Sequence, residues 1–272
     1  MRTAILMATY NGGKYLREQL DSILAQTCRD YLLYIRDDGS TDNTPQILAQ
    51  YASQDSRIRI VNDTVKHRGC GGSFRYLTET ADADCYLFSD QDDVWLPEKV
   101  ERTLDRLRAL DDSIPAAVHT DLQVVDESLK PLHPSFFRLT RREPEKASRL
   151  AYTCAYPTVT GCTAAFNRRA RDLMVAAPPV HCLHDRLLSL VVAAAGGTID
   201  WLPEATVLYR QHSSNVLGAT AERSAAQKLS RIRASWRDNR QWYDDVRAVA
   251  GISAAKFIAY KIRYLIPRLF SR

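Results

Sequence analysis

Short apolar segments alternate with amphipathic segments through the first 110 residues. Apolar, β-competent runs at 3–9, 31–36, 57–62 and 85–88 predict four strands. Between them, apolar residues at helical spacing predict helices at about 15–24, 43–51 and 73–80, and another helix begins near Pro97. Strand, turn and helix thus alternate four times. This rhythm is typical of an α/β fold, with a mostly parallel sheet and helices on both faces.

The pattern is less regular after residue 115. We expect one or two strands within 116–126, a strand at 160–166 and two strands at 198–202 and 206–209. Helices are predicted at 167–174 and from about residue 184 to 195. The stretch 131–157 carries prolines and charges, and we expect a mobile loop with a short helix there. Without repeats or a low-complexity linker, residues 1–217 are predicted to form one compact domain, followed by a tail at 218–272.

Polar residues follow three of the predicted strands. Tyr10 and Asn11 come after the first strand, Asp37 and Asp38 after the second, and an acidic cluster at 90–93 after the fourth. Ligands of parallel sheets bind outside the carboxyl ends of the strands. These side chains are therefore expected to line one crevice.

The acidic cluster contains Asp90, Asp92 and Asp93, three carboxylates that repel one another. A cation among them would relieve that repulsion, and Mg²⁺ or Mn²⁺ suits carboxylates combined with the oxygens of a substrate pyrophosphate. The alternative is an acidic turn before the helix near Pro97, because Asp favours helix starts.

Charge and cysteine usage narrow the class of protein. Residues 221–272 hold 12 Lys or Arg and 4 Asp or Glu, a balance of +8 within a chain of net charge +5. The rest of the chain is neutral to acidic, which is not typical of a nucleic-acid-binding protein. Only the basic tail is expected to contact an anionic surface. No apolar run approaches a membrane span, and residues 2–9 are too short for a signal peptide. The six cysteines show no paired metal-ligand spacing, which favours a reducing cytoplasm.

With these residues in place, the chain resembles the family-two glycosyltransferases of the GT-A fold, in particular bacterial rhamnosyltransferase-like members. The matching segments occur in family order over about residues 3–217: Ala8-Thr9-Tyr10-Asn11, Asp37 to Asp42, Asp90 to Trp95, Thr160-Gly161-Cys162, His184-Asp185 and Tyr209-Arg210-Gln211-His212. The resemblance implies a nucleotide-sugar-binding half at 1–115 and an acceptor-binding and catalytic half at 116–217.

The resemblance also implies a donor site for a dTDP- or UDP-linked sugar. Tyr10 would offer an aromatic face to the base, and Asp37 and Asp38 would accept hydrogen bonds from the base or the ribose. The donor-binding set is completed by Thr9, Asn11 and Asp90. Asp90, Asp92 and His212 would hold Mg²⁺ or Mn²⁺, which would neutralise the diphosphate leaving group. Tyr10 could instead be a strand-end core tyrosine, and the Asp pair could form an Asx turn.

Asp185 matches the family position of the catalytic base. Inversion by single displacement needs one carboxylate near the acceptor hydroxyl. The alternative for Asp185 is a helix N-cap, and a zinc site built from His181, Cys182 and His184 lacks a partner pair elsewhere. Residues expected on the acceptor side, or in support, are Asp93, Trp95, Gly161, Cys162, His184 and Arg210.

The tail carries an apolar stripe of Leu229, Ile232, Trp236, Tyr243 and Val246, followed by an aromatic and basic segment at 257–266. Basic helices rich in aromatic residues lie in the membrane interface and are attracted to anionic lipid. The alternatives are packing against the catalytic domain and a homodimer contact.

The sequence therefore predicts a metal-dependent, inverting glycosyltransferase of cell-surface polysaccharide synthesis. It would add one sugar, rhamnose being the one that the resemblance suggests, to a saccharide or lipid-linked acceptor, and would be cytoplasmic or peripheral on the inner face of the membrane. A nucleotidyltransferase and a non-catalytic nucleotide-sugar-binding module are the alternatives. The stretch 68–74 departs from the family pattern near the donor.

Overall fold

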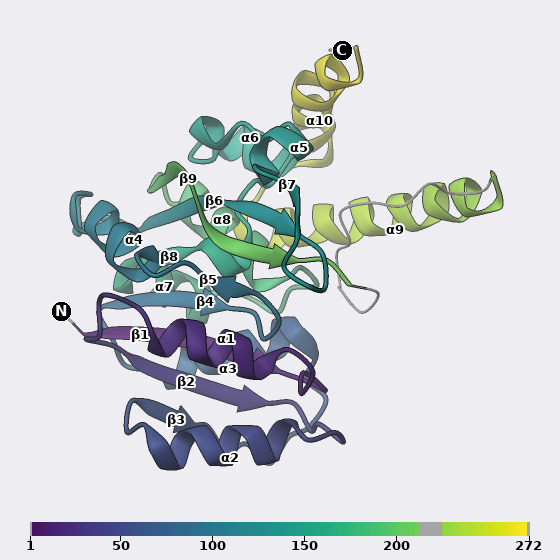
Figure 1. Ribbon diagram of the computed structural model, residues 1–272. Coiled ribbons are helices and arrows are strands. Elements are labelled where there is room, and N and C mark those ends of the chain that lie inside the picture. The colour runs from purple at the N-terminus through teal and green to yellow at the C-terminus, as the bar shows by residue number, and fades with distance from the viewer. Residues whose placement is uncertain (1, 213–224, 271–272) are drawn as a thin grey trace.

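The computed structural model describes residues 2–212 and 225–270, and in the last two helices it describes the side chains of residues 238–264. A central sheet runs through the body, with helices on both of its faces (Figure 1). In the described residues its strand order is β3-β2-β1-β4-β8-β6-β9-β5, and β7 pairs with β6.

The first half of the sheet is parallel, as the sequence predicts. It contains β1 (Thr3–Thr9), β2 (Leu32–Asp37), β3 (Ile58–Ile60) and β4 (Cys85–Ser89). The helices between and after them are α1 (Leu16–Leu24), α2 (Thr44–Gln54), α3 (Gly69–Thr80) and α4 (Lys99–Arg108). α3 begins at the glycine cluster itself rather than after it, because Asp38 accepts hydrogen bonds from the N–H groups of Arg68 and Gly69 at its start.

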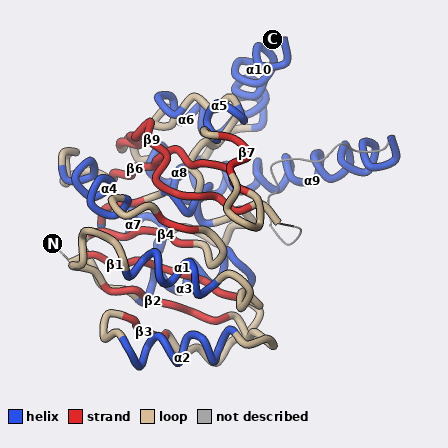
Figure 2. Tube along the Cα trace, in the orientation of Figure 1, coloured by secondary structure: helices blue, strands red, loops and turns tan. Residues whose placement is uncertain are grey.

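The second half of the sheet mixes parallel and antiparallel pairs. Figure 2 shows its strands in red among the blue helices. The strand β8 (Ala165–Asn167) runs antiparallel to β4 and to β6 (Ala116–Val125), and β9 (Thr198–Arg210) runs parallel to β6. β5 (Val94–Trp95) pairs with the end of β9. The two strands expected at 198–202 and 206–209 are one continuous strand. The residues between them are accommodated by two register shifts in the pairing with β6.

Two expectations for the middle of the chain are wrong. Residues Gly161–Thr163 form a 3₁₀ turn, η2, rather than part of a strand, with Thr163 N–H bonded to the Thr160 carbonyl. Residues 131–157 form a series of short elements rather than a mobile loop, and Tyr152 and Cys154 within them are fully buried. These elements are β7 (Pro131–His133), α5 (Phe136–Thr140), η1 (Pro144–Lys146) and α6 (Leu150–Ala155). Asp121 anchors them, because it accepts hydrogen bonds from the Ser135 hydroxyl and from Phe137 N–H.

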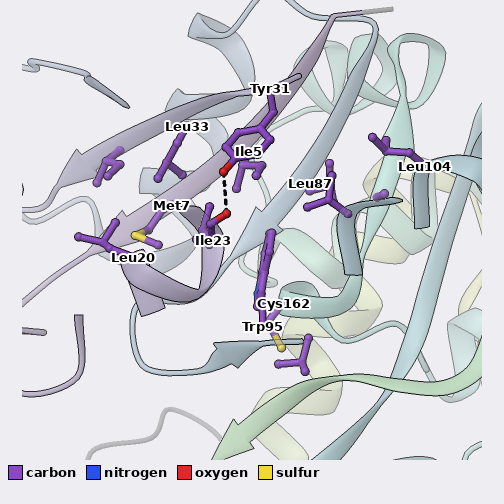
Figure 3. Packing of buried hydrophobic residues seen from close by; sticks show 14 of the residues in the cluster. Ile5, Met7, Leu20, Ile23, Tyr31, Leu33, Leu87, Trp95, Leu104 and Cys162 are labelled. Carbon is purple, nitrogen blue, oxygen red and sulfur yellow. Dashed lines mark hydrogen bonds between the residues drawn. The ribbon is translucent and has the colours of Figure 1, made fainter. Parts of the chain in front are cut away.

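Apolar clusters cover both faces of the sheet. One cluster packs α1, α2 and α4 on β1, β2 and β4, and Figure 3 shows its Ile5, Leu33 and Leu87 meeting Leu20 and Ile23. The other packs α3, α7 (Arg168–Ala176) and α8 (His184–Ala194) on the opposite face. Burial of parallel strands on both faces explains why their sequences are continuous apolar runs rather than alternating ones.

The tail forms α9 (Ala225–Ala250) and α10 (Ala254–Phe270). Trp242, Val246, Ile252 and Phe257 are buried in a third apolar cluster with Cys154 of α6 and Leu190 of α8. The tail therefore packs on the body through these side chains, which is one of the alternatives left open by the sequence. The start of α9 projects away from the body (Figure 1). The side chains of Leu229, Ile232, Trp236, Leu265 and Ile266, and the expected boundary after residue 217, lie outside the described residues. No helix in the described part of the chain is long and apolar enough to cross a membrane.

Candidate active site

The carboxyl ends of β1, β2 and β4 lie at one edge of the sheet. The register pairs Thr9 with Asp37 and Met7 with Ser89, so the loops after these strands leave the sheet side by side. The Thr9 hydroxyl donates a 2.9 Å hydrogen bond to Asp37 Oδ1. The structure thus brings together the three strand ends that the sequence marks as chemically distinctive.

Tyr10 presents its ring at this edge. The side chain is 49% exposed, and the ring stands edge-to-face against His67 with 5.8 Å between ring centroids. Its backbone is held by Gln91, which accepts from Tyr10 N–H at 2.9 Å and donates to the Tyr10 carbonyl at 3.1 Å. Tyr10 is therefore an available platform rather than a core residue, and neither Gln91 nor His67 was identified from the sequence.

Asn11 and Asp37 shape the adjoining loop. Asn11 has a φ of 48°, and its Oδ1 accepts from Thr41 N–H at 2.8 Å. Asp37 accepts from Gly39 N–H at 3.3 Å, which is the bond of an Asx turn. It also accepts from Ser40 N–H at 2.9 Å and from the Ser40 hydroxyl at 2.5 Å. Both side chains are thus engaged within the loop that borders the crevice.

Asp38 is turned away from the crevice and is buried. It accepts from Arg36 Nη1 at 2.6 Å, from Arg68 N–H at 2.9 Å and from Gly69 N–H at 2.8 Å. Burial alone would raise the pKa of Asp38, but these hydrogen bonds outweigh it and the pKa is lowered. The structure places Asp38 in the anchor of α3, so a ribose contact would have to compete with these bonds.

Asp90 and Asp92 lie at the end of β4, both partly exposed. Burial, then the charges of Asp92 and Asp185, raise the pKa of Asp90 to about 7. On the other side, Asp92 Oδ2 lies 2.9 Å from Nε2 of His212. The structure thus places Asp92 against His212 and within reach of the Asp90 charge. Carboxylates and an imidazole are groups that can bind a divalent cation.

A second group of candidate ligand atoms lies behind the first. Among the described residues, ligand atoms of Asp90, Asp93 and Cys162 lie within 4.8 Å of one another. Burial and the nearby Asp charges raise the pKa of the Cys162 thiol, and a protonated thiol is a poor ligand for Mg²⁺ or Mn²⁺. Of the predicted metal ligands, Asp90 also belongs to this second group.

Asp93, Trp95 and Cys162 are buried rather than exposed to an acceptor. Lys99 is buried beside them, with its Nζ 4.1 Å from the centroid of the Trp95 ring. Burial lowers the pKa of Lys99 to about 8, although the Asp93 carboxylate opposes that shift. Asp93, Trp95 and Cys162 are therefore enclosed beneath the acidic loop, and this position fits the supporting role that the sequence left open for them.

Arg210 holds the acidic loop from behind. Its guanidinium donates to the Asp92 carbonyl at 2.9 Å, the Glu127 carbonyl at 2.6 Å and Glu18 Oε2 at 2.6 Å. Its backbone N–H donates to Asp93 Oδ1 at 3.2 Å. With only 1% of the residue exposed, Arg210 supports the loop rather than meeting a ligand.

Asp185 lies in the first turn of α8, and Leu183 is the N-cap. The N-cap alternative for Asp185 is therefore wrong. Asp185 Oδ1 accepts from Arg186 N–H at 2.7 Å, and a carboxylate is favoured in the first turn by the helix dipole. Its charge reaches Asp90 across the crevice, where it contributes to the raised pKa of that carboxyl.

His184 points into the core instead. Its ring stacks on Phe74 with 3.8 Å between centroids and lies against Gly161, where an added Cβ would come within 2.4 Å of Nε2. Burial lowers the pKa of His184 to about 4. His184 and Gly161 thus pack closely together at the start of α8, and the His184 ring is enclosed by the core.

Arg142 was not singled out as a site residue by the sequence. It donates to the Thr158 carbonyl and, at 3.0 Å, to the Thr160 hydroxyl, and its guanidinium lies 4.8 Å from the centroid of Phe136. Burial lowers the pKa of Arg142, while the Asp185 charge counteracts this shift. Arg142 is therefore a cation close enough to influence Asp185, and only the fold brings the two together.

Comparison with known proteins identifies the family. The sequence model described as glycosyl transferase family 2 matches residues 4–173, which include β1, the acidic loop and η2. The chain belongs to glycosyl transferase family 2. This finding confirms the resemblance, shows that the protein is a glycosyltransferase, and makes the nucleotidyltransferase alternative wrong.

Relatives and solved structures agree with this assignment. The chain is 30% identical over 244 residues to the dTDP-rhamnosyl transferase RfbG of Shigella flexneri, covering 85% of this chain and 80% of that protein. An uncharacterized glycosyltransferase of Nostoc is 25% identical over 278 residues, covering 100% and 84%. The fold is similar to that of S. aureus TarS in complex with UDP-GlcNAc, with a TM-score of 0.64, 17% identity and coverage of 100% and 74%. It is also similar to the mannosyltransferase PcManGT of Pyrobaculum calidifontis in complex with GDP-Man and Mn²⁺, with a TM-score of 0.59, 16% identity and coverage of 98% and 87%. These two similarities confirm the GT-A type of fold.

Proposed function

We propose that this family 2 member inverts the anomeric centre of a nucleotide-diphosphate sugar, with Asp185 as the catalytic base. One observation carries the proposal: Asp185 stands in the first turn of α8 and is close enough to Asp90 for its charge to raise the pKa of that carboxyl. A single displacement requires one such carboxylate beside the acceptor hydroxyl.

In this reaction an acceptor hydroxyl lies between Asp185 and the anomeric carbon. The hydroxyl oxygen forms a bond to that carbon while the bond from the carbon to the diphosphate oxygen breaks. The hydroxyl proton passes to Asp185, and the leaving diphosphate takes the electron pair. Asp185 stays in place because Arg186 N–H binds its Oδ1.

A divalent cation held by Asp90, Asp92 and His212 would supply charge neutralisation to the diphosphate. The presence of Mn²⁺ in the complex of the related mannosyltransferase supports this choice of cofactor class. Arg210 contributes by holding the backbone carbonyl of Asp92 in place. Tyr10 contributes an exposed ring on which the nucleotide base can stack.

The donor that we propose is dTDP-rhamnose. The support is the relative named a dTDP-rhamnosyl transferase, whose match extends over 85% of this chain. A saccharide or lipid-linked saccharide of the cell surface is the proposed acceptor class.

The decisive experiment replaces Asp185 with Asn, which keeps nearly the same volume. With dTDP-rhamnose, Mn²⁺ and an acceptor mixture, the rate of transfer should fall by about 10²- to 10⁴-fold. The melting temperature and the affinity for dTDP should stay close to those of the wild type, because Asp185 is not the N-cap. A variant that transfers at the wild-type rate would move the base elsewhere. Asp121 and Asp126 are the next carboxylates to replace, although Asp121 already accepts from Ser135 and Phe137, and Asp126 from Ser128 N–H.

We also propose that the outer face of α10 rests on an anionic membrane. Ile258 and Ile262 are 57% and 54% exposed and lie one helical turn apart, with Lys256 and Arg263 also exposed. The inner face of α10 packs on the body through Phe257 and through Tyr264, whose ring is 5.2 Å from that of Tyr152. An apolar ridge flanked by basic residues is the composition of an interfacial helix.

Vesicle sedimentation tests the membrane proposal. The wild type should bind phosphatidylcholine vesicles that contain phosphatidylglycerol, and should bind them less as salt rises. The Ile258→Asp, Ile262→Asp double variant should lose this binding and keep its melting temperature. A wild type that ignores these vesicles would leave α10 as a packing element only.

A further inference from the structure

The loop at 177–183 connects α7 to α8 and leads directly into Asp185. On one side of this loop lies a cavity of about 420 Å³. Its walls are the loop residues Val180 and Cys182 and, across the cavity, Gly71 and Arg75 of α3. Arg75 donates to the Ala177 carbonyl at 2.8 Å and to the Pro178 carbonyl at 3.2 Å, so α3 holds the start of the loop. The end of the loop, at His181 and Cys182, leads into α8 and borders the open space of the cavity.

The other side of the loop is held by Asp245 of α9. One carboxylate oxygen of Asp245 accepts from His181 N–H at 2.9 Å and lies 3.1 Å from His181 Nδ1. The second oxygen accepts from Cys182 N–H at 2.9 Å. Asp245 itself is only 2% exposed, so these hydrogen bonds are shielded from water.

The helix that carries Asp245 is rigidly attached to the body. The indole N–H of Trp242 donates to the Cys154 carbonyl at 2.7 Å, and Val246 is buried against Leu190 of α8 in the same cluster. The hydrogen bond from Leu187 N–H to the Leu183 carbonyl then joins the loop to the first turn of α8. A continuous chain of contacts therefore runs from α9 through His181 and Cys182 to Asp185.

We propose that Asp245 is a positioning residue for the transfer reaction: the C-terminal helix α9 sets the loop 177–183, and through it the place of Asp185. The proposal rests on the proposed function of Asp185 as the base. It gives the tail a part in the active site, since Asp245 holds the end of the loop, whereas Arg75 of α3 holds only its start. A shift of about 1 Å in a reacting group can cost about 10²-fold in rate.

The test compares Asp245→Asn with Asp244→Asn, a matched control because Asp244 is exposed on the same helix. An Asn can still accept one of the two backbone N–H bonds, but its amide nitrogen meets the other as donor against donor. With dTDP-rhamnose and Mn²⁺, we expect the transfer or donor-hydrolysis rate of Asp245→Asn to fall about 10- to 100-fold. The affinity for dTDP, measured by calorimetry, should be unchanged, and Asp244→Asn should behave as the wild type. His181→Ala should have a small effect, because both backbone bonds remain.

A lower melting temperature with an unchanged rate constant would mean that Asp245 is merely structural and would overturn the proposal. Hydrogen exchange of the wild type decides the point independently of any variant: the amides of His181 and Cys182 should exchange slowly although they lie in a loop. Free exchange there would also overturn it. Failure of the proposed function looks different, because Asp185→Asn would then keep the wild-type rate or the wild type would act on no nucleotide sugar.

Discussion

Two buried histidines show how strongly the surroundings of a residue change its pKa. His119 on β6 is fully buried, edge-to-face with Phe137, and burial lowers its pKa to about 3. His184 is buried between aromatic rings with a pKa lowered to about 4. Each imidazole is neutral in the folded protein and takes up a proton near its ordinary pKa of 6.5 once unfolded.

The difference between the folded-state and unfolded-state pKa values of these histidines predicts that the protein loses stability in acid. Between about pH 6.5 and pH 4 the unfolded chain binds more protons than the folded one, so the free energy of unfolding falls as the pH falls. His119→Leu removes one of these groups and should make the melting temperature less dependent on pH in that window. Thermal melts of both proteins from pH 7 to pH 4 check this. Parallel curves would show that His119 is not a source of the dependence.

At Asp92 the prediction concerns the cation. Asp92→Asn should abolish the metal-dependent part of dTDP binding, because it removes a charged ligand while the Arg210 bond to the Asp92 backbone carbonyl remains. The fold should therefore persist. Calorimetry of dTDP with and without Mn²⁺ measures the effect, with Asp105→Asn on α4 as the control carboxylate. Unchanged affinity in the presence of Mn²⁺ would argue against the metal assignment.

At the level of secondary structure, η2 and α8 can pack closely because the residue of η2 at their contact is a glycine. A Cβ at Gly161 would lie 2.4 Å from His184 Nε2, whereas one at Gly71 of α3 would lie 3.6 Å from the Cys182 carbonyl oxygen. The first is a clash and the second an ordinary contact. Gly161 thus lets the 3₁₀ turn approach the start of α8 closely enough to fix Asp185.

The two glycines make a matched pair of variants. Gly161→Ala should cost about 1–3 kcal/mol by overpacking and should also slow transfer, since α8 must shift. Gly71→Ala should be neutral or stabilising by up to about 1 kcal/mol, because alanine is the better helix former. Denaturant melts measure the free energy of unfolding of both variants. Equal stability of Gly161→Ala and Gly71→Ala would contradict the close packing at Gly161.

At the scale of the whole molecule, the tail joins the catalytic body. Trp242 is buried and donates to the Cys154 carbonyl, and Lys261 Nζ donates to the Ala155 carbonyl at 2.9 Å. The helices α9 and α10, which are both far from α6 in the sequence, therefore both donate hydrogen bonds to it. The same helices present Asp245 to the loop before Asp185 and two exposed isoleucines to solvent.

Trp242→Ala should consequently affect stability and activity together. The loss of a buried indole is expected to cost about 3–5 kcal/mol, and release of α9 should slow transfer without weakening dTDP binding. Gln241→Ala, at an exposed neighbouring position, is the control. A less stable and slower Trp242→Ala protein that still binds dTDP would fit this account, whereas the wild-type stability or the wild-type rate would contradict it.

The sequence by itself determined the parallel half of the sheet and the edge at which the chemistry lies. Its apolar runs are strands buried on both faces, and the polar residues after them had to meet where parallel strands end. The tertiary structure alone decided which of those residues face the crevice. Asp38 became the anchor of α3, and Asp93, Trp95 and Cys162 became core, because distant segments such as β9 and η2 cover them. Asp245 and Arg142 reach the catalytic side only through packing between segments far apart in the chain, and local periodicity carries no information about such contacts.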